Sequence, residues 1–411
     1  MNSKKDTFGS RGSISIWISA LIPLLAIALL ITLFLLGDPL ALFSNSLPPI
    51  EELTFERIRI TDDGFEATLI NGGPDPVTIS QVLVDEAYWK FEIIPSGSIS
   101  RLGRATLFIP YPWVEYEAHE IVVITPSGAT FSEEVPLSTP SPSFGWREFA
   151  AYGLIGVYVG VVPVVLGMLW YPAMKAIDRK WLGAILALTV GLLVFLLIDT
   201  LLEAFEIAAE LPGFFQGIPL TLFVALLTWL GLLALGERQR AGKRSSGTNP
   251  GLYLASMIAL GIGLHNLGEG LAIGAAFASG EASLGSFLVI GFMLHNLTEG
   301  IGIAAPLLPG SRPDAQKHRR VGLSTFAWLA LLAGAPAIIG AWFGGFAFSP
   351  IFATIFLGIG LGAIWQVIVE VFNLLRDYAD HEDTPLFSVL NVIGFSVGIL
   401  IMYLTAFLVK F

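Results

Sequence analysis

The chain of 411 residues contains no cysteine, and only 13% of its residues are charged. The absence of cysteine excludes disulfide bridges and thiolate metal sites, and it leaves the redox compartment undetermined. Soluble globular proteins usually carry about 25% charged residues, so this shortage favours a surface that largely faces lipid. What the chain does contain agrees with that: 54% of its residues are hydrophobic, and its 44 glycines suit close packing of helices in a membrane.

Nine apolar segments are long enough to cross a bilayer, which takes roughly 20 mostly apolar residues in a helix. The first segment, about Ile14–Leu36, follows Lys4, Lys5 and Arg11. A signal peptide is the alternative, but its apolar core usually spans only about 7–15 residues and precedes a small-residue cleavage site, so we expect a retained anchor. The other eight segments lie near Phe149–Trp170, Leu182–Phe205, Ile218–Leu235, Leu252–Ala278, Leu284–Leu307, Leu323–Phe346, Ile351–Leu374 and Phe387–Leu408.

The composition changes between the first and second apolar segments, where Asp, Glu, Thr, Pro and Gly are frequent. Short apolar runs such as Phe65–Ile70 and Glu120–Ile124 are bounded by turn-forming clusters such as Asn71–Pro76, a spacing typical of a small β-sandwich. Its one histidine, His119, has no catalytic constellation around it. We therefore predict a cytoplasmic N-terminus (1–12), a transmembrane anchor (13–37), an extracytoplasmic all-β, Ig-like domain (47–138), a linker (139–147) and an eight-helix domain (148–411).

The basic residues indicate how the chain is oriented. With the N-terminus in the cytoplasm, nine spans place nearly every basic residue of the helical region in the inner loops, as the positive-inside rule requires. We expect a multi-pass protein of the cell membrane with the β domain outside. The inner basic residues are Lys4, Lys5, Arg11, Lys175, Arg179, Lys180, Arg238, Arg240, Lys243, Arg244, Arg312, Lys317, Arg319, Arg320 and Arg376.

Two neighbouring spans contain the same polar pattern, His-Asn-Leu-x-Glu-Gly, at residues 265–270 and 295–300. Ionisable residues are costly inside a bilayer, so each is a functional hypothesis by default. On a helix, His265 and Glu269 are four residues apart and share a face, and Asn266 lies beside them. If the two helices pack antiparallel, two imidazoles, two carboxylates and two amides meet near the middle of the membrane.

Imidazole nitrogen together with carboxylate oxygen suits zinc, iron, manganese, cobalt or nickel better than calcium or magnesium. Two histidines and two glutamates can close a four-coordinate site, and the amides with the far carboxylate oxygens can hold a second ion. We expect Gly270 and Gly300 to let the two helices approach closely. The alternative is a pair of structural polar ladders that join helices by hydrogen bonds. The predicted ligands are His265, Asn266, Glu269, His295, Asn296 and Glu299.

Two further groups of polar residues lie within the predicted spans. Asp199, Glu203 and Glu206 form an acidic stripe toward the outer end of their span, where they would attract cations, or would be a solvated helix end. Gln366 and Glu370 share one face of a later span toward the cytoplasm, and we expect them to be ligands on the way out.

The two motifs resemble the fourth and fifth transmembrane helices of the ZIP (Zrt/Irt-like) metal transporters, especially the prokaryotic branch with HNxxEG in both helices. The likeness covers the last eight spans, about Phe149–Phe411, and covers neither the anchor nor the β domain. It implies an all-α polytopic membrane protein with a 3+2+3 helix arrangement, metal uptake toward the cytoplasm, and frequently a homodimer. It also implies a primary site of His265, Glu269, His295 and Glu299, with an adjacent site formed by Asn266, Asn296 and the two glutamates.

The sequence departs from this family at three places. The Glu-Pro pair of the sixth family helix corresponds to Ala335-Pro336, and a ligand of the second family helix falls near Leu193. The loop Glu237–Asn249 lacks the histidines that many eukaryotic relatives carry. A single-ion centre is therefore favoured over a stable pair of ions.

The expected function is transport of divalent transition-metal ions, zinc first and also iron, manganese or cadmium, by alternating access through the midplane site. The expected partners are these ions, the lipid bilayer and a second copy of the chain, with no nucleic acid. An intramembrane metalloenzyme is one alternative, although the sequence has no HExxH and the symmetric site has no obvious separate general base. A metal-sensing receptor, with the β domain as its output module, is the other.

Overall fold

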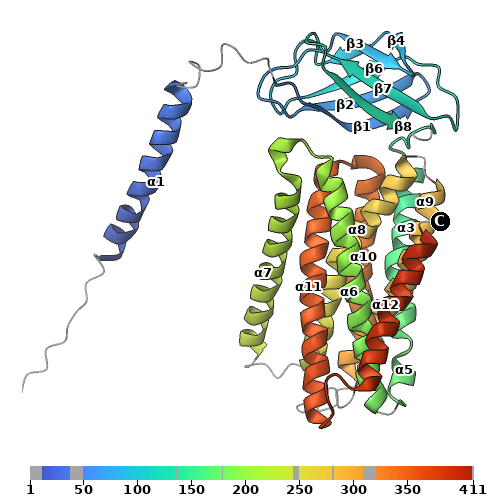
Figure 1. Cartoon of the computed structure of the whole chain (residues 1–411). Coiled ribbons are helices and arrows are strands. Elements are labelled where there is room, and N and C mark those ends of the chain that lie inside the picture. Colours follow the sequence, from blue (N-terminus) through green and yellow to red (C-terminus); the bar gives the residue numbers. More distant parts are fainter. Residues whose placement is uncertain are drawn as a thin grey trace, which may run out of the picture. The chain divides into compact units, whose positions relative to one another are not determined.

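The computed structural model (Figure 1) describes residues 12–37, 50–135, 138–177, 179–243, 250–279, 282–308 and 321–409. Residues 1–11 of the predicted cytoplasmic N-terminus, and the predicted start of the β domain at residue 47, lie outside the described residues. The chain divides into two units, Met1–Ile50 and Glu51–Phe411. The first unit contains the helix α1 (Gly12–Gly37), an uninterrupted apolar helix where the sequence predicted one. Its role as a membrane anchor stays a prediction.

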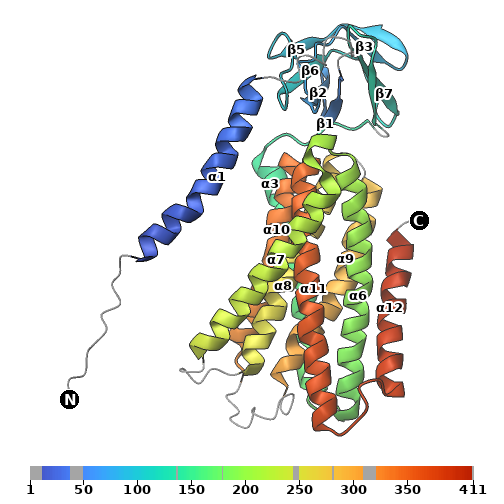
Figure 2. The same cartoon turned by 60° about the vertical axis from the view of Figure 1, so that its left-hand side comes forward.

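The N-terminal part of the second unit is a β-sandwich, which confirms the predicted all-β region. Its two four-stranded sheets have the orders β1-β2-β6-β5 and β4-β3-β7-β8, and every strand pair within them is antiparallel. Figure 2 shows the sheets lying face to face, and alternate residues such as Ala67, Leu69 and Leu107 fill the core between them. The strands are β1 (Leu53–Thr61), β2 (Gly64–Asn71), β3 (Gln81–Val84), β4 (Ala87–Trp89), β5 (Glu92–Ile94), β6 (Arg104–Ile109), β7 (His119–Ile124) and β8 (Thr130–Val135).

A polar network fastens the turn between β3 and β4 to the rest of the sandwich. Asp85 adopts a positive φ of 50° in this turn. Its carboxylate accepts hydrogen bonds from the Tyr111 hydroxyl (2.9 Å) and the Glu120 N–H (3.0 Å), and it lies 2.7 Å from Nδ1 of the buried His119. Burial raises the pKa of Asp85, but these hydrogen bonds outweigh burial and leave the pKa below its ordinary value.

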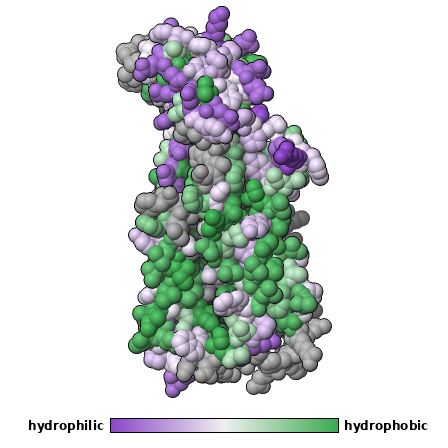
Figure 3. Space-filling view, turned by 90° about the vertical axis from the view of Figure 1, so that its right-hand side faces the viewer, coloured by the Kyte–Doolittle hydropathy of each residue, from purple (hydrophilic) through white to green (hydrophobic). Residues whose placement is uncertain are grey.

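The remainder of the second unit is a bundle in which eight helices, among the residues that the structure describes, are long and apolar enough to cross a membrane. Figure 3 shows hydrophobic residues gathered over the helices and hydrophilic residues over the strands. The first span combines α3 (Trp146–Gly156), η1 (Val157–Val161), α4 (Val162–Met168) and α5 (Tyr171–Met174). The others are α6 (Arg179–Ala209), α7 (Gly217–Lys243), α8 (Pro250–Ala278), α9 (Ala282–Ala304), α10 (Leu323–Ala347), α11 (Pro350–His381) and α12 (Val389–Val409), with short helices η2 (Gly213–Phe215) and η3 (Ala305–Leu307).

Close backbone contacts at glycines join the helices of the bundle into two tightly packed groups. A Cβ atom on Gly270 of α8 would lie 2.1 Å from the Ala337 carbonyl oxygen of α10, and one on Gly300 of α9 would lie 2.3 Å from the Val164 oxygen of α4. Backbones in direct contact thus join α3, α4, α8, α9 and α10, which we call the motif group. The same kind of contact joins α6 to α12 and α7 to α11, and with the packing of α11 on α6 these helices form the second group.

The boundary between the groups is packed differently. Gly261, Gly268 and Gly302 of the motif group face the second group, and the first atom that a Cβ would meet there belongs to the side chain of Val367, Leu357 or Thr189. Side chains can adjust where two backbones cannot. The prediction that Gly270 and Gly300 bring α8 and α9 together is wrong, because these glycines instead press each motif helix against α10 and α4.

Candidate metal centre

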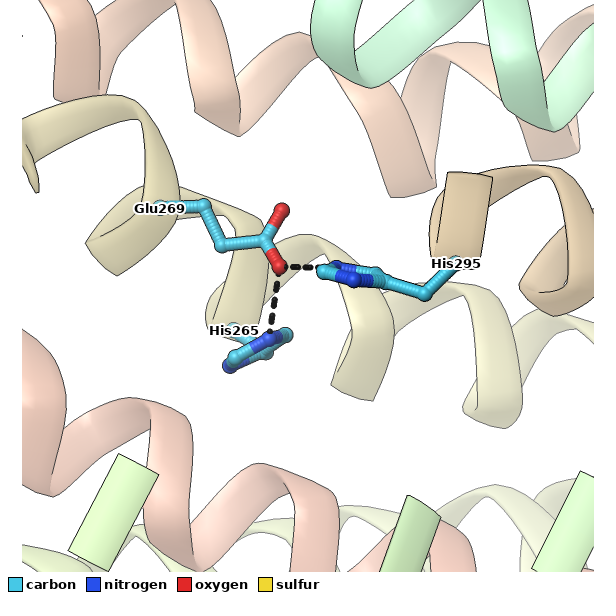
Figure 4. Close-up of side chains that lie close together, drawn as sticks. All are labelled: His265, Glu269 and His295. Carbon is cyan, nitrogen blue, oxygen red and sulfur yellow. Dashed lines mark hydrogen bonds and ion pairs between the residues drawn. The ribbon is translucent and has the colours of Figure 1, made fainter. Parts of the chain in front are cut away.

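Three of the predicted ligands meet in the interior of the bundle (Figure 4). His265 and Glu269 lie one turn apart on α8, and His295 reaches them from α9, which follows α8 directly and packs against it. The Nε2 atoms of His265 and His295 lie 3.0 Å and 2.5 Å from the same carboxylate oxygen, Glu269 Oε1. All three residues are at most 5% exposed. The helical spacing and the pairing of adjacent helices therefore converge on one carboxylate.

The geometry of this trio suits a transition-metal ion. One ligand atom from each residue lies within 4.8 Å of the other two. In a tetrahedral zinc site with bonds of about 2.0–2.1 Å, neighbouring ligand atoms are roughly 3.3 Å apart. Small side-chain rotations would therefore open the present contacts to the spacing that an ion requires. Two imidazole nitrogens and one carboxylate oxygen leave the fourth position to water or another side chain.

The fourth predicted primary ligand, Glu299, lies outside this trio. It is 5% exposed, and neither of its carboxylate oxygens has a hydrogen-bonding partner among the described residues. With His295 and Thr189 it lines a small cavity of about 10 Å³, close to the volume that a single water molecule needs. Burying a carboxylate without a hydrogen-bonding partner costs free energy, so packing alone does not explain a glutamate at this position.

The two asparagines of the motifs hold neighbouring helices that contain proline. Pro163 lacks an N–H, so the carbonyl of Val159 four residues earlier has no helical donor at that position, and Asn296 Nδ2 donates to it at 3.2 Å. Asn266 Nδ2 donates at 3.0 Å to the carbonyl of Ala333, beside Pro336 in α10. Asn296 Nδ2 also lies 3.0 Å from Glu269 Oε2, which orients that carboxylate. The amide nitrogens therefore do structural work, while both Oδ1 atoms have no partner within the described part of the chain.

The predicted acidic stripe lines a vestibule of 860 Å³ that reaches His295. Asp199, Glu203 and Glu206 of α6 form one wall, and residues of α8, α9, α11 and α12 form the others. The vestibule opens at the end of the bundle that carries the β domain, because Ser279 and Phe348 at that end also line it. His295 lines both the vestibule and the small cavity of Glu299, so it stands between them.

Gln366 and Glu370, the predicted exit ligands, are buried on α11 and do not line the vestibule. Gln366 Nε2 donates to Glu370 Oε1 at 3.1 Å, as expected for residues one turn apart. Leu193 lines the small cavity beside Glu299, and Pro336 packs against Gly263. At both positions the sequence departs from the family pattern, and neither residue adds a ligand to the trio.

Sequence reasoning missed the role of Pro163, although a proline in the middle of an apolar segment is a readable signal of an unpaired carbonyl. It also missed that Thr189 lines the cavity beside Glu299. The Thr189 hydroxyl donates to the Ile185 carbonyl of its own helix, and no sequence pattern marks the residue as part of a site.

Comparison of the chain with protein-family models and with curated proteins finds no match to either. The structure establishes a membrane-type helical protein with a buried His/Glu group that could hold a metal ion. The resemblance to ZIP transporters accordingly stays a prediction.

Proposed function

We propose that the protein carries divalent transition-metal ions across a membrane, with zinc as the first candidate and iron, manganese and cadmium as the others. The observation that carries this proposal is the trio of His265, Glu269 and His295, buried within apolar helices at the inner end of an acid-lined vestibule. A vestibule lined by carboxylates concentrates cations, and imidazoles with a carboxylate bind them after most of their water is lost. A purely structural polar ladder needs no such path from the surface.

The two helix groups supply a mechanism for alternating access. All three trio residues belong to the motif group, whereas the acids of the vestibule belong to α6 in the second group. Because the first atoms that Gly261, Gly268 and Gly302 would meet across the boundary belong to side chains, the motif group can slide or rock against the second group and carry the ion with it. Such a movement would close the vestibule and turn the trio toward the end of the bundle where Glu299, Gln366 and Glu370 lie.

The resemblance of the motifs to ZIP transporters supports this proposal and extends it. It favours the 3+2+3 arrangement, uptake toward the cytoplasm, a homodimer and a place in the cell membrane with the β domain outside, in agreement with the basic inner loops. A metal ion displaces protons from imidazole and carboxyl groups, so binding weakens as the pH falls.

The test is metal uptake by the purified full chain in proteoliposomes, comparing Zn²⁺, Fe²⁺, Mn²⁺ and Cd²⁺. We expect saturable uptake that His295→Ala abolishes and that His381→Ala, a matched change at an exposed histidine far along α11, leaves intact. Tight metal binding without flux would refute transport and favour a sensor, and metal-dependent hydrolysis of a peptide or lipid would favour an enzyme. Equal uptake by the two variants would remove the trio from the mechanism.

A further inference from the structure

The β domain contacts both helix groups of the bundle. Arg57 of β1 donates through Nη1 to the carbonyl of Phe346 at the end of α10, which belongs to the motif group, at 2.8 Å. One residue earlier, Glu56 accepts a hydrogen bond of 3.0 Å from Ser349, the residue just before α11 of the second group. Adjacent residues of one strand therefore bind the short connection between the two groups, one at its α10 end and one at its α11 end.

A third contact fixes the sandwich to the second group. Glu52 accepts a hydrogen bond of 2.7 Å from the N–H of Gly213 in η2, between α6 and α7. Glu56 is itself held by Arg104 of β6 through two hydrogen bonds of 2.5 Å and 2.8 Å. Burial raises the pKa of Glu56, but the hydrogen bonds from Arg104 and Ser349 outweigh it and leave the pKa below its ordinary value. Glu56 is therefore an anion at neutral pH.

Two of these residues, Glu56 and Arg57, line a chamber that adjoins the vestibule. A chamber of 360 Å³ lies between strands β1 and β8 and the ends of α6 and α8, and Glu133 and Glu210 are among its lining residues. The chamber shares Ala275, Ser279 and Phe348 with the vestibule, so the two spaces adjoin. The β domain thus lies where the vestibule opens.

We propose that the β domain is a clamp that holds the motif group and the second group in the arrangement in which the vestibule is open. The sandwich has its own continuous hydrophobic core, so it acts as one body. If the groups move relative to one another, one body cannot keep the bond of Arg57 to the end of α10 and the bond of Glu52 to η2 at once. Interactions made in one state only shift the population toward that state. The clamp rests on the proposed alternating access, and it gives the β domain a role in setting the transport rate.

The test measures how accessible the vestibule is when the clamp is cut. Because the chain contains no cysteine, Ala272→Cys in the vestibule wall provides a single thiol for a charged, membrane-impermeant maleimide. Arg57→Ala removes the bond to the motif group. Arg59→Ala is the matched control, since Arg59 lies two residues along the same strand and its ion pair, with Glu66 at 3.5 Å, stays within the β domain. Glu52→Ala cuts the clamp at the second group instead.

We expect Arg57→Ala and Glu52→Ala each to slow labelling of the thiol at least threefold, and Arg59→Ala to leave the rate unchanged. Labelling of either variant at the unmodified rate, or an equal effect of Arg59→Ala, would overturn the clamp. Hydrogen exchange of β2 and β6 in the full chain verifies that the sandwich stays folded, and the labelling rate of Glu52→Ala decides the matter if Arg57→Ala unfolds the sandwich. Labelling requires no transport, so failure of uptake refutes the proposed function and failure of this experiment refutes the clamp alone.

Discussion

Two glycines of one motif give the most direct test of the two-group architecture. Gly268 and Gly270 flank Glu269 on α8, but they face different groups. A Cβ on Gly270 would lie 2.1 Å from the Ala337 oxygen, about 1.3 Å short of the 3.4 Å at which such contacts become ordinary, and no side-chain rotation relieves it. A Cβ on Gly268 would already lie 3.4 Å from Leu357 Cδ2, at the end of a flexible side chain.

Replacing either glycine by alanine favours the helix by up to about 1 kcal/mol, since glycine is the poorer helix former. At Gly270 the forced separation of α8 from α10 costs about 1–3 kcal/mol, as overpacking does in other cores. We therefore expect Gly270→Ala to lower thermal stability in detergent and to reduce metal binding by moving Glu269. Gly268→Ala should be neutral or slightly stabilising.

The assay is thermal unfolding of the two purified variants beside the unmodified chain, with zinc binding measured on each by calorimetry. Equal stability of the two variants would refute the distinction between contacts of backbones and contacts of side chains. Loss of stability in Gly268→Ala alone would reverse it, and would place the tight contact at the boundary, where sliding could not occur.

Three further predictions address separate parts of the molecule. Glu203→Gln is expected to raise the KM of metal uptake severalfold at unchanged kcat, because the residue lines the vestibule away from the trio; an unchanged KM would argue against electrostatic attraction. Asn296→Ala should cost about 1–3 kcal/mol of stability by leaving the Val159 carbonyl without its donor. Adding Pro163→Ala, which restores a backbone N–H, should recover part of that loss in thermal unfolding, and strict additivity would contradict the pairing. Because the pKa of Asp85 is lowered in the folded state, its stabilising contribution is present above about pH 4 and is lost as the pH falls through the lower, folded pKa. Hydrogen exchange of β3 and β7 in the full chain should accelerate over that range, and Asp85→Asn should flatten the change.

Much of the fold follows from the sequence because its signals are local. The eight apolar runs predicted after the β domain coincide with the eight candidate spans of the described residues, and the run Phe65–Ile70 lies within β2. The spacing of His265 and Glu269 placed them on one helical face, and a short connection made α8 and α9 neighbours. Periodicity and loop length are sufficient for all of these.

What the sequence could not provide depends on which helices meet. Gly270 and Gly300 each follow the glutamate of the same hexapeptide, and nothing in that pattern shows which helix either glycine will face. In the structure Gly270 faces α10 and Gly300 faces α4. The contact of Arg57 with Phe346 joins residues 289 positions apart, and no pattern on either segment announces it. Such contacts are decided by the packing of whole surfaces, which a single sequence does not display.

The duplicated motif shows how identical residues acquire different roles. Glu269 and Glu299 occupy equivalent positions in their hexapeptides, yet two imidazoles and the Asn296 amide surround Glu269, while Glu299 has no partner within the described residues. The difference arises because His295 turns toward α8 and joins Glu269 instead of the glutamate one turn along its own helix. A path from the vestibule through His295 would thus bring an ion first to the trio and then toward an unpaired carboxylate. The two copies of the motif would therefore act one after the other along the path of the ion. A carrier needs such a direction, and a structural polar ladder does not.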